Sequence, residues 1–128
     1  MTGLQLTVLP GRLAVCRLAA GSPMPAWAMS DVFLSITRTA DELSIVCRQE
    51  HLPTGITAER GWACLKVAGP LDFALTGVLV GLAAPLADAG ISIFAVSTYD
   101  TDYLLVKEAD LPAAIDTLEG AGHRISTR

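Results

Sequence analysis

Residues 90–115, GISIFAVSTYDTDYLLVKEADLPAAI, give the clearest indication of the fold. The apolar run ISIFAV leads into the polar hexapeptide STYDTD, and the chain returns through YLLV, which is the pattern of two strands joined by a turn. Asp110 then stands where it can cap a helix. One face of that helix is an i, i+3, i+4, i+7 stripe of Leu111, Ala114, Ile115 and Leu118. The segment therefore predicts a hairpin followed by an amphipathic helix.

The pattern extends in both directions from this segment. Upstream, residues 62–68 read as a strand that ends at Gly69-Pro70, and Thr76 is placed to N-cap a helix over residues 77–88. The apolar face of that helix comprises Val78, Leu82 and Leu86, with Leu79 and Ala83 beside them. Pro85 removes a backbone donor and is expected to bend or weaken its last turn. Downstream, Gly120 and Gly122 end the second helix, and HRIST, residues 123–127, forms a last short strand.

The resulting order for residues 59–128 is β-α-β-β-α-β. This is the ferredoxin-like arrangement of the α+β class, in which we expect an antiparallel sheet with two helices on one face. Residues 1–58 are instead rich in short strands: LQLTVL, RLAVCRL, VFLSIT and LSIVCR. The polar segment HLPTGITAERG, residues 51–61, reads as a connector between the two parts. Residues 1–58 are expected to be a degraded copy of the same unit, with helices reduced to turns.

The composition limits the classes of function. The 128 residues are 52% hydrophobic and 17% charged, which favours an oligomer that covers apolar surface. A formal charge of −4 without any Lys- or Arg-rich window argues against nucleic acid as a partner. No apolar run reaches the ~20 residues that span a membrane, and the first residues read as a strand, so we expect a cytoplasmic protein.

Residues that could support catalysis are few. His51 and His123 have no neighbouring nucleophile and orienting group, and solvated surface histidines are the simpler interpretation. Gly77 and Gly81 do not match a phosphate-binding loop. The three cysteines stand singly in apolar stretches without a metal-ligand spacing, which predicts free, buried thiols and no metal. We therefore expect neither an enzyme nor a cofactor.

The densest set of polar groups is the hexapeptide at residues 97–102. Asp and Thr form local backbone hydrogen bonds in turns, so a simple hairpin turn is one interpretation. A hairpin turn needs only two to five residues and no aromatic ring. Here hydroxyls, a phenol ring and two carboxylates gather at one end of a sheet, and a binding site is the other interpretation.

The STYxTDYxLV core, together with WACLKVAGPLDFALTGVL upstream, resembles the second ACT unit of the CASTOR-like family of amino-acid-sensing ACT proteins. A weaker resemblance extends to FLSITRTADELSIVC in the first half. The resemblance implies tandem ACT units with the first one degenerate. It also implies a homodimer that pairs the second units side by side and binds a free amino acid at the seam.

The resemblance also implies a set of ligand-binding residues. The loop that opens the first helix contributes Leu75, Thr76, Gly77 and Val78; the hairpin contributes Thr98, Tyr99, Thr101 and Asp102; and the facing unit contributes Ser92 and Ile93. One position departs from the arginine sensors of the family. They carry an acidic residue where Leu75 stands, so arginine is in doubt as the ligand and a neutral or apolar amino acid becomes possible.

These observations predict a non-catalytic, amino-acid-binding ACT protein that acts as a sensor or regulator through an unidentified downstream protein partner. The alternative is a structural ACT dimerisation module with a vestigial ligand site. Binding of a metabolite would separate the two.

Overall fold

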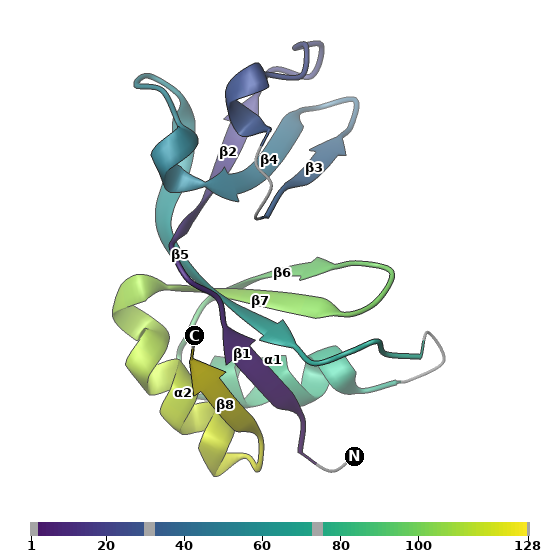
Figure 1. The fold of residues 1–128 in the computed structure, drawn as a ribbon, viewed down its shortest axis with the longest axis vertical. Coiled ribbons are helices and arrows are strands. Elements are labelled where there is room, and N and C mark those ends of the chain that lie inside the picture. Colours follow the sequence, from purple (N-terminus) through teal and green to yellow (C-terminus); the bar gives the residue numbers. More distant parts are fainter. Residues whose placement is uncertain (1–2, 30–32, 73–75, 128) are drawn as a thin grey trace. The chain divides into compact units, whose positions relative to one another are not determined.

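The computed structural model describes residues 3–29, 33–72 and 76–127, and the chain forms two compact units (Figure 1). The first unit combines Met1–Pro10 with Ala63–Arg128, and the second unit is Gly11–Trp62. Strand β5 (Thr57–Val67) contributes its second part to the first unit and its first part to the second unit.

The first unit holds five strands and two α-helices in its described residues. They are β1 (Gln5–Val8), the second part of β5, α1 (Val78–Asp88), β6 (Ile93–Ser97), β7 (Asp102–Lys107), α2 (Leu111–Gly120) and β8 (Arg124–Thr127), with a single 3₁₀ turn at Glu108–Asp110. From β5 to β8 the order of elements is β-α-β-β-α-β, which confirms the predicted ferredoxin-like α+β fold.

The strands of this unit lie in the order β6-β7-β5-β1-β8. Strand β1 runs antiparallel to β5, with Leu6 opposite Val67, and parallel to β8, with Leu6 opposite Ile125. Strand β1 is thus an interior strand of the sheet, and it lies between β5 and β8, the first and last strands of the ferredoxin-like unit. This placing of residues 1–10 differs from the expected division into 1–58 and 59–128.

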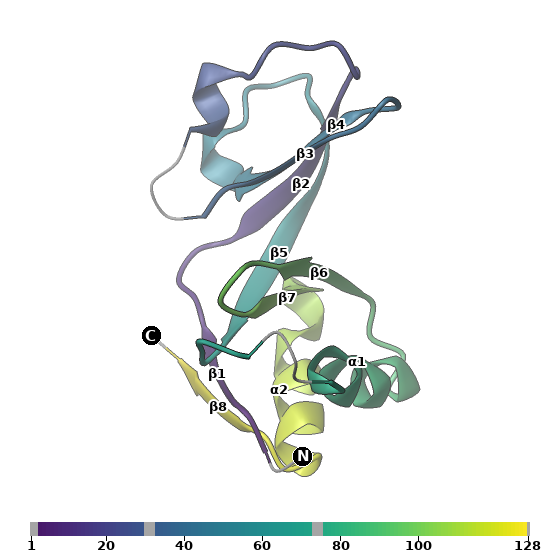
Figure 2. The same ribbon diagram turned by 90° about the vertical axis from the view of Figure 1, so that its right-hand side faces the viewer.

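The two helices pack on the same face of this sheet and enclose the core of the first unit (Figure 2). The expected apolar stripes face inward: α1 buries Val78, Leu82 and Leu86, and α2 buries Ala114 and Leu118. The sheet contributes side chains that are at most 7% exposed, namely Leu6, Val8, Ala63, Leu65, Val67, Leu104 and Val106. The 3.6-residue period in the sequence therefore identified the buried faces of both helices correctly.

Helix α1 differs from prediction at its start. Gly77, rather than Thr76, occupies the N-cap position, with φ of 79° and no side-chain cap. A left-handed φ costs glycine little, because it has no Cβ. The chain can therefore make a sharp entry into the helix here, and a threonine side chain is not needed to cap it.

Pro85 neither ends nor shortens α1, which continues to Asp88. A proline cannot donate to the carbonyl four residues earlier, so Gly81 loses its helical hydrogen bond. His123 replaces it: its Nε2 lies 3.3 Å from the Gly81 oxygen, while its Nδ1 accepts from the Leu4 backbone N–H at 3.0 Å. The prediction that His123 is a solvated surface residue was therefore wrong.

The second unit is built mainly of strands. It comprises β2 (Leu13–Leu18), β3 (Ser35–Arg38), β4 (Leu43–Arg48) and the first part of β5, with single 3₁₀ turns at Ala26–Ala28 and Gln49–His51. The strand order is β3-β4-β2-β5, with antiparallel neighbours. Its core consists of Ala14, Cys16, Ala28, Leu43, Ile45 and Cys47. Whether this unit is a degraded ACT copy stays a prediction.

The polar segment at residues 51–61 is only partly a connector. Strand β5 begins at Thr57, and residues 57–59 already pair with Arg17, Cys16 and Val15 of β2. Residues 57–61 are exposed or half-buried, so the strand shows no buried apolar face in this part and its sequence reads as polar. The expected strand at residues 62–68 is therefore only the buried second part of a longer one.

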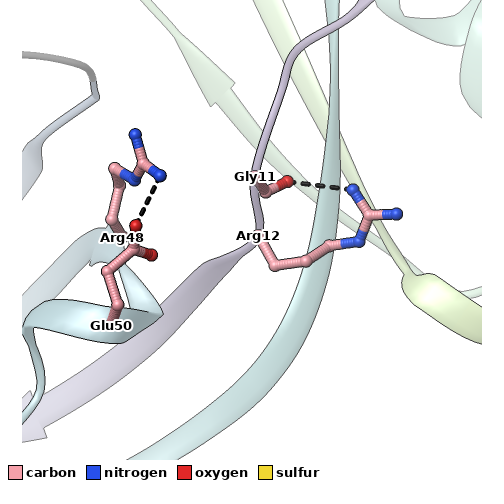
Figure 3. Close-up of polar contacts among 4 residues, drawn as sticks. All are labelled: Gly11, Arg12, Arg48 and Glu50. Atoms are coloured by element: carbon pink, nitrogen blue, oxygen red, sulfur yellow. Dashed lines mark hydrogen bonds and ion pairs between the residues drawn. The ribbon is translucent and has the colours of Figure 1, made fainter.

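In the second unit, polar side chains form contacts at the end of β4 and just before β2 (Figure 3). The Arg48 guanidinium forms an ion pair with Glu50, which holds the pKa of that exposed carboxyl below its usual value. Arg12 donates to the Gly11 oxygen at 2.9 Å. Gly11 has φ of 80°, and a Cβ there would lie 3.3 Å from the Arg48 guanidinium. Glycine therefore suits both the backbone and the limited space at this position.

Candidate functional site

A cavity of about 180 Å³ opens on the first unit, where three segments meet. They are the chain that follows β5, the first turn of α1, and the hairpin between β6 and β7. The described residues that line the cavity are Leu71, Asp72, Val78, Ser97, Thr98, Tyr99, Asp100, Thr101 and Asp102. The polar hexapeptide that the sequence singled out is therefore entirely part of the lining.

Local hydrogen bonds shape the hairpin. The Thr98 backbone N–H donates to the Thr101 oxygen at 2.8 Å, and the Thr98 hydroxyl accepts from the Thr101 N–H at 3.3 Å. Where the strands meet, Ser97 Oγ donates to Asp102 Oδ1 at 2.6 Å, which fixes the orientation of that carboxylate. The hexapeptide thus forms the local bonds of a hairpin turn and also lines a cavity.

Thr101 joins the hairpin to the end of β5. Its side chain is only 5% exposed, and its Oγ1 donates to the Val67 oxygen at 2.7 Å. A second bond runs from the Leu71 N–H to the Asp100 oxygen at 2.6 Å. Gly69 permits this close approach, since a Cβ there would lie 3.0 Å from the Asp100 oxygen and 3.1 Å from the Thr101 Cβ. Two walls of the cavity are therefore held together by backbone-directed hydrogen bonds.

The structure gathers half of the expected site residues at the cavity, namely Val78, Thr98, Tyr99, Thr101 and Asp102. Thr76 and Gly77 are exposed just before α1 and are not among the lining residues. Ser92 is exposed and Ile93 begins β6, also outside the lining. Leu75 lies outside the described residues.

Two lining residues, Leu71 and Asp72, were missed by the sequence reasoning. Gly69-Pro70 was interpreted only as the end of a strand, and the residues after it received no role. Their position follows from the bond between the Leu71 N–H and Asp100 and from the lack of a side chain at Gly69, neither of which is visible in a local pattern. The useful signal was a carboxylate in the short segment between the strand and the first helix.

The lining of the cavity is rich in polar side chains. It offers three carboxylates, three hydroxyl side chains and the phenol of Tyr99, which is 80% exposed. No histidine, cysteine or lysine is among the described residues that line it. Across the part of the chain that the structure describes, no group of three or more His, Cys, Asp or Glu residues is placed to hold a metal ion. The arrangement can bind a positively charged or hydrogen-bonding group of a small molecule.

The cysteines lie away from this cavity, and all three are free and buried. Burial raises the pKa of Cys64 to about 12. In the core of the second unit, a hydrogen bond to Cys47 together with burial raises the pKa of Cys16. The same hydrogen bond lowers the pKa of Cys47. All three thiols are enclosed and pack as small side chains in the cores of the two units.

A model of the ACT domain matches residues 57–120, which is half of the chain. The chain belongs to the ACT domain family. A second family model, described as an N-terminal domain, matches residues 11–55 and coincides with most of the second unit. No helix in the described part of this ACT protein is long and apolar enough to cross a membrane.

The curated proteins that are similar in sequence to this chain include CASTOR proteins. The human protein described as putative protein CASTOR3P is 33% identical over 133 residues, covering 91% of this chain and 81% of its own length. The bovine cytosolic arginine sensor for mTORC1 subunit 1 is 34% identical over 97 residues. That match covers 67% of this ACT protein and only 30% of the sensor, so the chain spans less than a third of the sensor's length.

Solved structures share the whole fold. A crystal structure of an Agrobacterium tumefaciens protein is 42% identical, with a TM-score of 0.94 over 100% of this chain and 96% of that one. The regulatory subunit of aspartate kinase from Thermus flavus has a TM-score of 0.61 at 14% identity, covering 94% and 97% of the two chains. At this low identity the second likeness shows a shared fold.

Proposed function

We propose that this chain is a non-catalytic regulator that binds a free amino acid in the cavity between α1 and the 97–102 hairpin, at the interface of a homodimer. Membership of the ACT family and similarity to a protein described as an arginine sensor support a regulatory, amino-acid-sensing role. The observation that carries the proposal is the cavity itself, because it unites five of the residues that the resemblance assigned to the ligand.

The cavity offers complementary groups for an amino acid. Asp102 accepts a charge-assisted hydrogen bond from an ammonium group, and Ser97 already holds its carboxylate in place. The start of α1 presents backbone N–H groups and the positive end of the helix dipole, which suit a ligand carboxylate. Val78, 6% exposed, offers an apolar surface beside them.

A second copy of the chain supplies the other wall in this proposal. Strand β6 is an edge of the first unit's sheet and carries the uncharged sequence IFAVS. Helix α1, just before it, has Asp88 as its only charged residue and exposes Val80 by 62%. An uncharged edge and helix face suit a two-fold interface, in which each patch meets its own copy. Ser92 and Ile93, outside the lining of their own cavity, would approach a ligand from the partner.

Ligand binding is tested by measuring thermal stability with each of the twenty amino acids. A ligand at ~100 times its Kd stabilises the folded state by about 2.7 kcal/mol, an easily measured shift for a domain of this size. Titration calorimetry of Asp102→Asn is then expected to show roughly ten- to a hundred-fold weaker binding of the amino acid identified. Undiminished affinity in that variant would place the ligand elsewhere.

The dimer is tested with two matched substitutions. Val80→Glu adds a charge to α1, and Met29→Glu adds one to a side chain of the second unit that is equally exposed, at 62%. Sedimentation at micromolar concentration is expected to show a dimer for the parent and for Met29→Glu, and a 13.4 kDa monomer for Val80→Glu. A parent that is monomeric with and without amino acids would refute the interface.

The second candidate function is a structural dimerisation module with a vestigial site. The uncharged edge of β6 and the exposed apolar face of α1 favour it, because they support a dimer whether or not the cavity is occupied. A stable dimer that is not stabilised by any of the twenty amino acids would establish this alternative.

A further inference from the structure

We propose that residues 11 and 61 are the two points of a hinge between the two units, and that Gln49 holds this hinge in one conformation. The chain passes from one unit to the other twice, between Pro10 and Gly11 and between Trp62 and Ala63. The hinge lets the second unit rotate as a body. It does not depend on a ligand in the cavity, and it is therefore separate from the proposed function.

The backbone at both passages is the first support for a hinge. Gly11 is the first residue of the second unit and Gly61 is its last but one, and their φ angles are 80° and 79°. Glycine adopts positive and negative φ with similar ease, so the backbone can change its conformation at these positions with little cost. Hinges are commonly a few such residues, in loops or at the ends of elements, that absorb a large change in φ and ψ.

An irregularity in the pairing of β5 with β2 is the second support. Leu13 lies opposite Trp62, whereas Val15 lies opposite Glu59, so two residues of β5 face a single residue of β2. Such a bulge takes a residue out of the ladder of hydrogen bonds and bends the strand that carries it. A Cβ at Gly61 would meet no atom within 4 Å, so packing does not require a glycine there. The conformation of the backbone is therefore the reason for glycine at this point of β5.

Gln49 forms hydrogen bonds to both passages of the chain. Its backbone N–H donates to the oxygen of Arg12, the residue after Gly11, at 3.1 Å. Its side-chain Oε1 accepts from the Gly61 N–H at 2.9 Å, and its backbone oxygen accepts from Arg60 Nη1 at 3.3 Å. The Gln49 side chain thus replaces the ladder partner that the bulge removes. The bond to Gly61 is the one that a substitution of Gln49 deletes, since the other two use its main chain.

Double electron–electron resonance between one nitroxide label on each unit tests the hinge. Met29→Cys in the second unit and Asp116→Cys in the first provide exposed sites for the labels, whereas all three native cysteines are buried. Mixing with an excess of unlabelled protein ensures that each assembly carries one labelled chain. We expect a single narrow distance distribution without the Gln49 substitution, and a distribution at least about twice as wide in Gln49→Ala, because the hinge is no longer held in one conformation.

Hydrogen exchange of β2 and β4 separates rotation of the second unit from its unfolding. The Gly61 N–H is only partly buried, so water can replace the lost acceptor, and the amides of β2 and β4 are expected to stay protected in Gln49→Ala. Loss of that protection together with the wider distribution would mean that the second unit unfolds, and would overturn the inference.

Gln5→Ala is the matched control, because it removes the same side chain from an exposed position on β1. It is expected to leave the distribution narrow. The double variant Gln49→Ala, Gly61→Asn tests the hinge point itself. Asparagine can adopt the left-handed conformation but has less freedom than glycine, so the distribution is expected to narrow again. An unchanged distribution in Gln49→Ala, or a wide one before any substitution of Gln49, would overturn the role of Gln49. A double variant as wide as Gln49→Ala would overturn the hinge at residue 61.

Discussion

Replacing Thr101 by Val is expected to destabilise the first unit and to loosen its cavity. The substitution keeps the shape of the side chain but removes the hydroxyl that donates to the Val67 oxygen at 2.7 Å. Thr101 is 5% exposed and Val67 is fully buried, so water has little access to the carbonyl that loses its donor. A buried carbonyl without a partner costs about 1–3 kcal/mol.

We therefore expect Thr101→Val to lower the free energy of unfolding by about 2 kcal/mol. Roughly 3–6 °C of Tm correspond to each kcal/mol in a chain of this length, so Tm falls by roughly 10 °C. Thr101→Ser keeps the hydroxyl and is the matched control, with an expected loss below about 1 kcal/mol for its missing methyl group. Equilibrium urea unfolding at fixed protein concentration measures both variants.

Hydrogen exchange gives a local measurement of the same contact. The Leu71 N–H, which donates to the Asp100 oxygen, is expected to exchange faster in Thr101→Val, because the turn of the hairpin loses its side-chain bond to the end of β5. Equal stability of the Val and Ser variants, with unchanged exchange at Leu71, would refute the view that this hydroxyl holds the two walls together.

Three further predictions concern the fold. His123→Phe removes hydrogen bonds to two backbone groups that are partly exposed to water, so a loss of about 0.5–1.5 kcal/mol is expected in urea unfolding, and an unchanged stability would contradict it. Gly3→Ala would place a Cβ 1.9 Å from the Gly122 oxygen and should lower Tm clearly, whereas Gly21→Ala meets no atom within 4 Å and should not. Cys64, with its pKa raised to about 12, should react with iodoacetamide at pH 8 at least about a hundred-fold more slowly than a free thiol. Because an unfolded chain releases this proton near pH 9, the stability that Cys64 contributes is expected to fall as pH rises from about 9 towards 12.

The sequence predicted well wherever the decisive interactions are local. The stripe of Val78, Leu82 and Leu86 is buried as expected, because a 3.6-residue period directly encodes one face of a helix. The hairpin at residues 97–102 formed as expected because its strands are adjacent in the chain and its turn bonds lie within the hexapeptide. Five of the residues that the resemblance assigned to the ligand line the cavity, and four of them belong to this locally formed hairpin.

Prediction failed where distant segments meet. Nothing near β1 in the sequence indicates that it pairs with both β5 and β8, more than fifty residues away. Asp72 lies at the cavity because the neighbouring Leu71 N–H donates to the Asp100 oxygen. The acceptor of His123 is the Gly81 carbonyl on α1, which has no helical donor because residue 85 is proline. Such contacts depend on tertiary packing, and the spacing of apolar residues along the chain does not show which distant segments meet.

The central position of β1 sets an order of events during synthesis. Leu6 and Val8 are fully or nearly fully buried between β5 and β8, yet the ribosome must first make residues 11–62 before β5 can offer a partner to β1. At ~5–20 residues per second this delay lasts several seconds. Strand β8, 119 residues away at the pair Thr7 and Ser126, arrives last. The second unit is one uninterrupted segment of the chain and can thus fold early. The sheet of the ACT unit is complete only when β1, β5 and β8 have all been synthesised. A fragment cut at the ACT match of residues 57–120 lacks β1 and β8 together, and so lacks two of the five strands on which its helices pack.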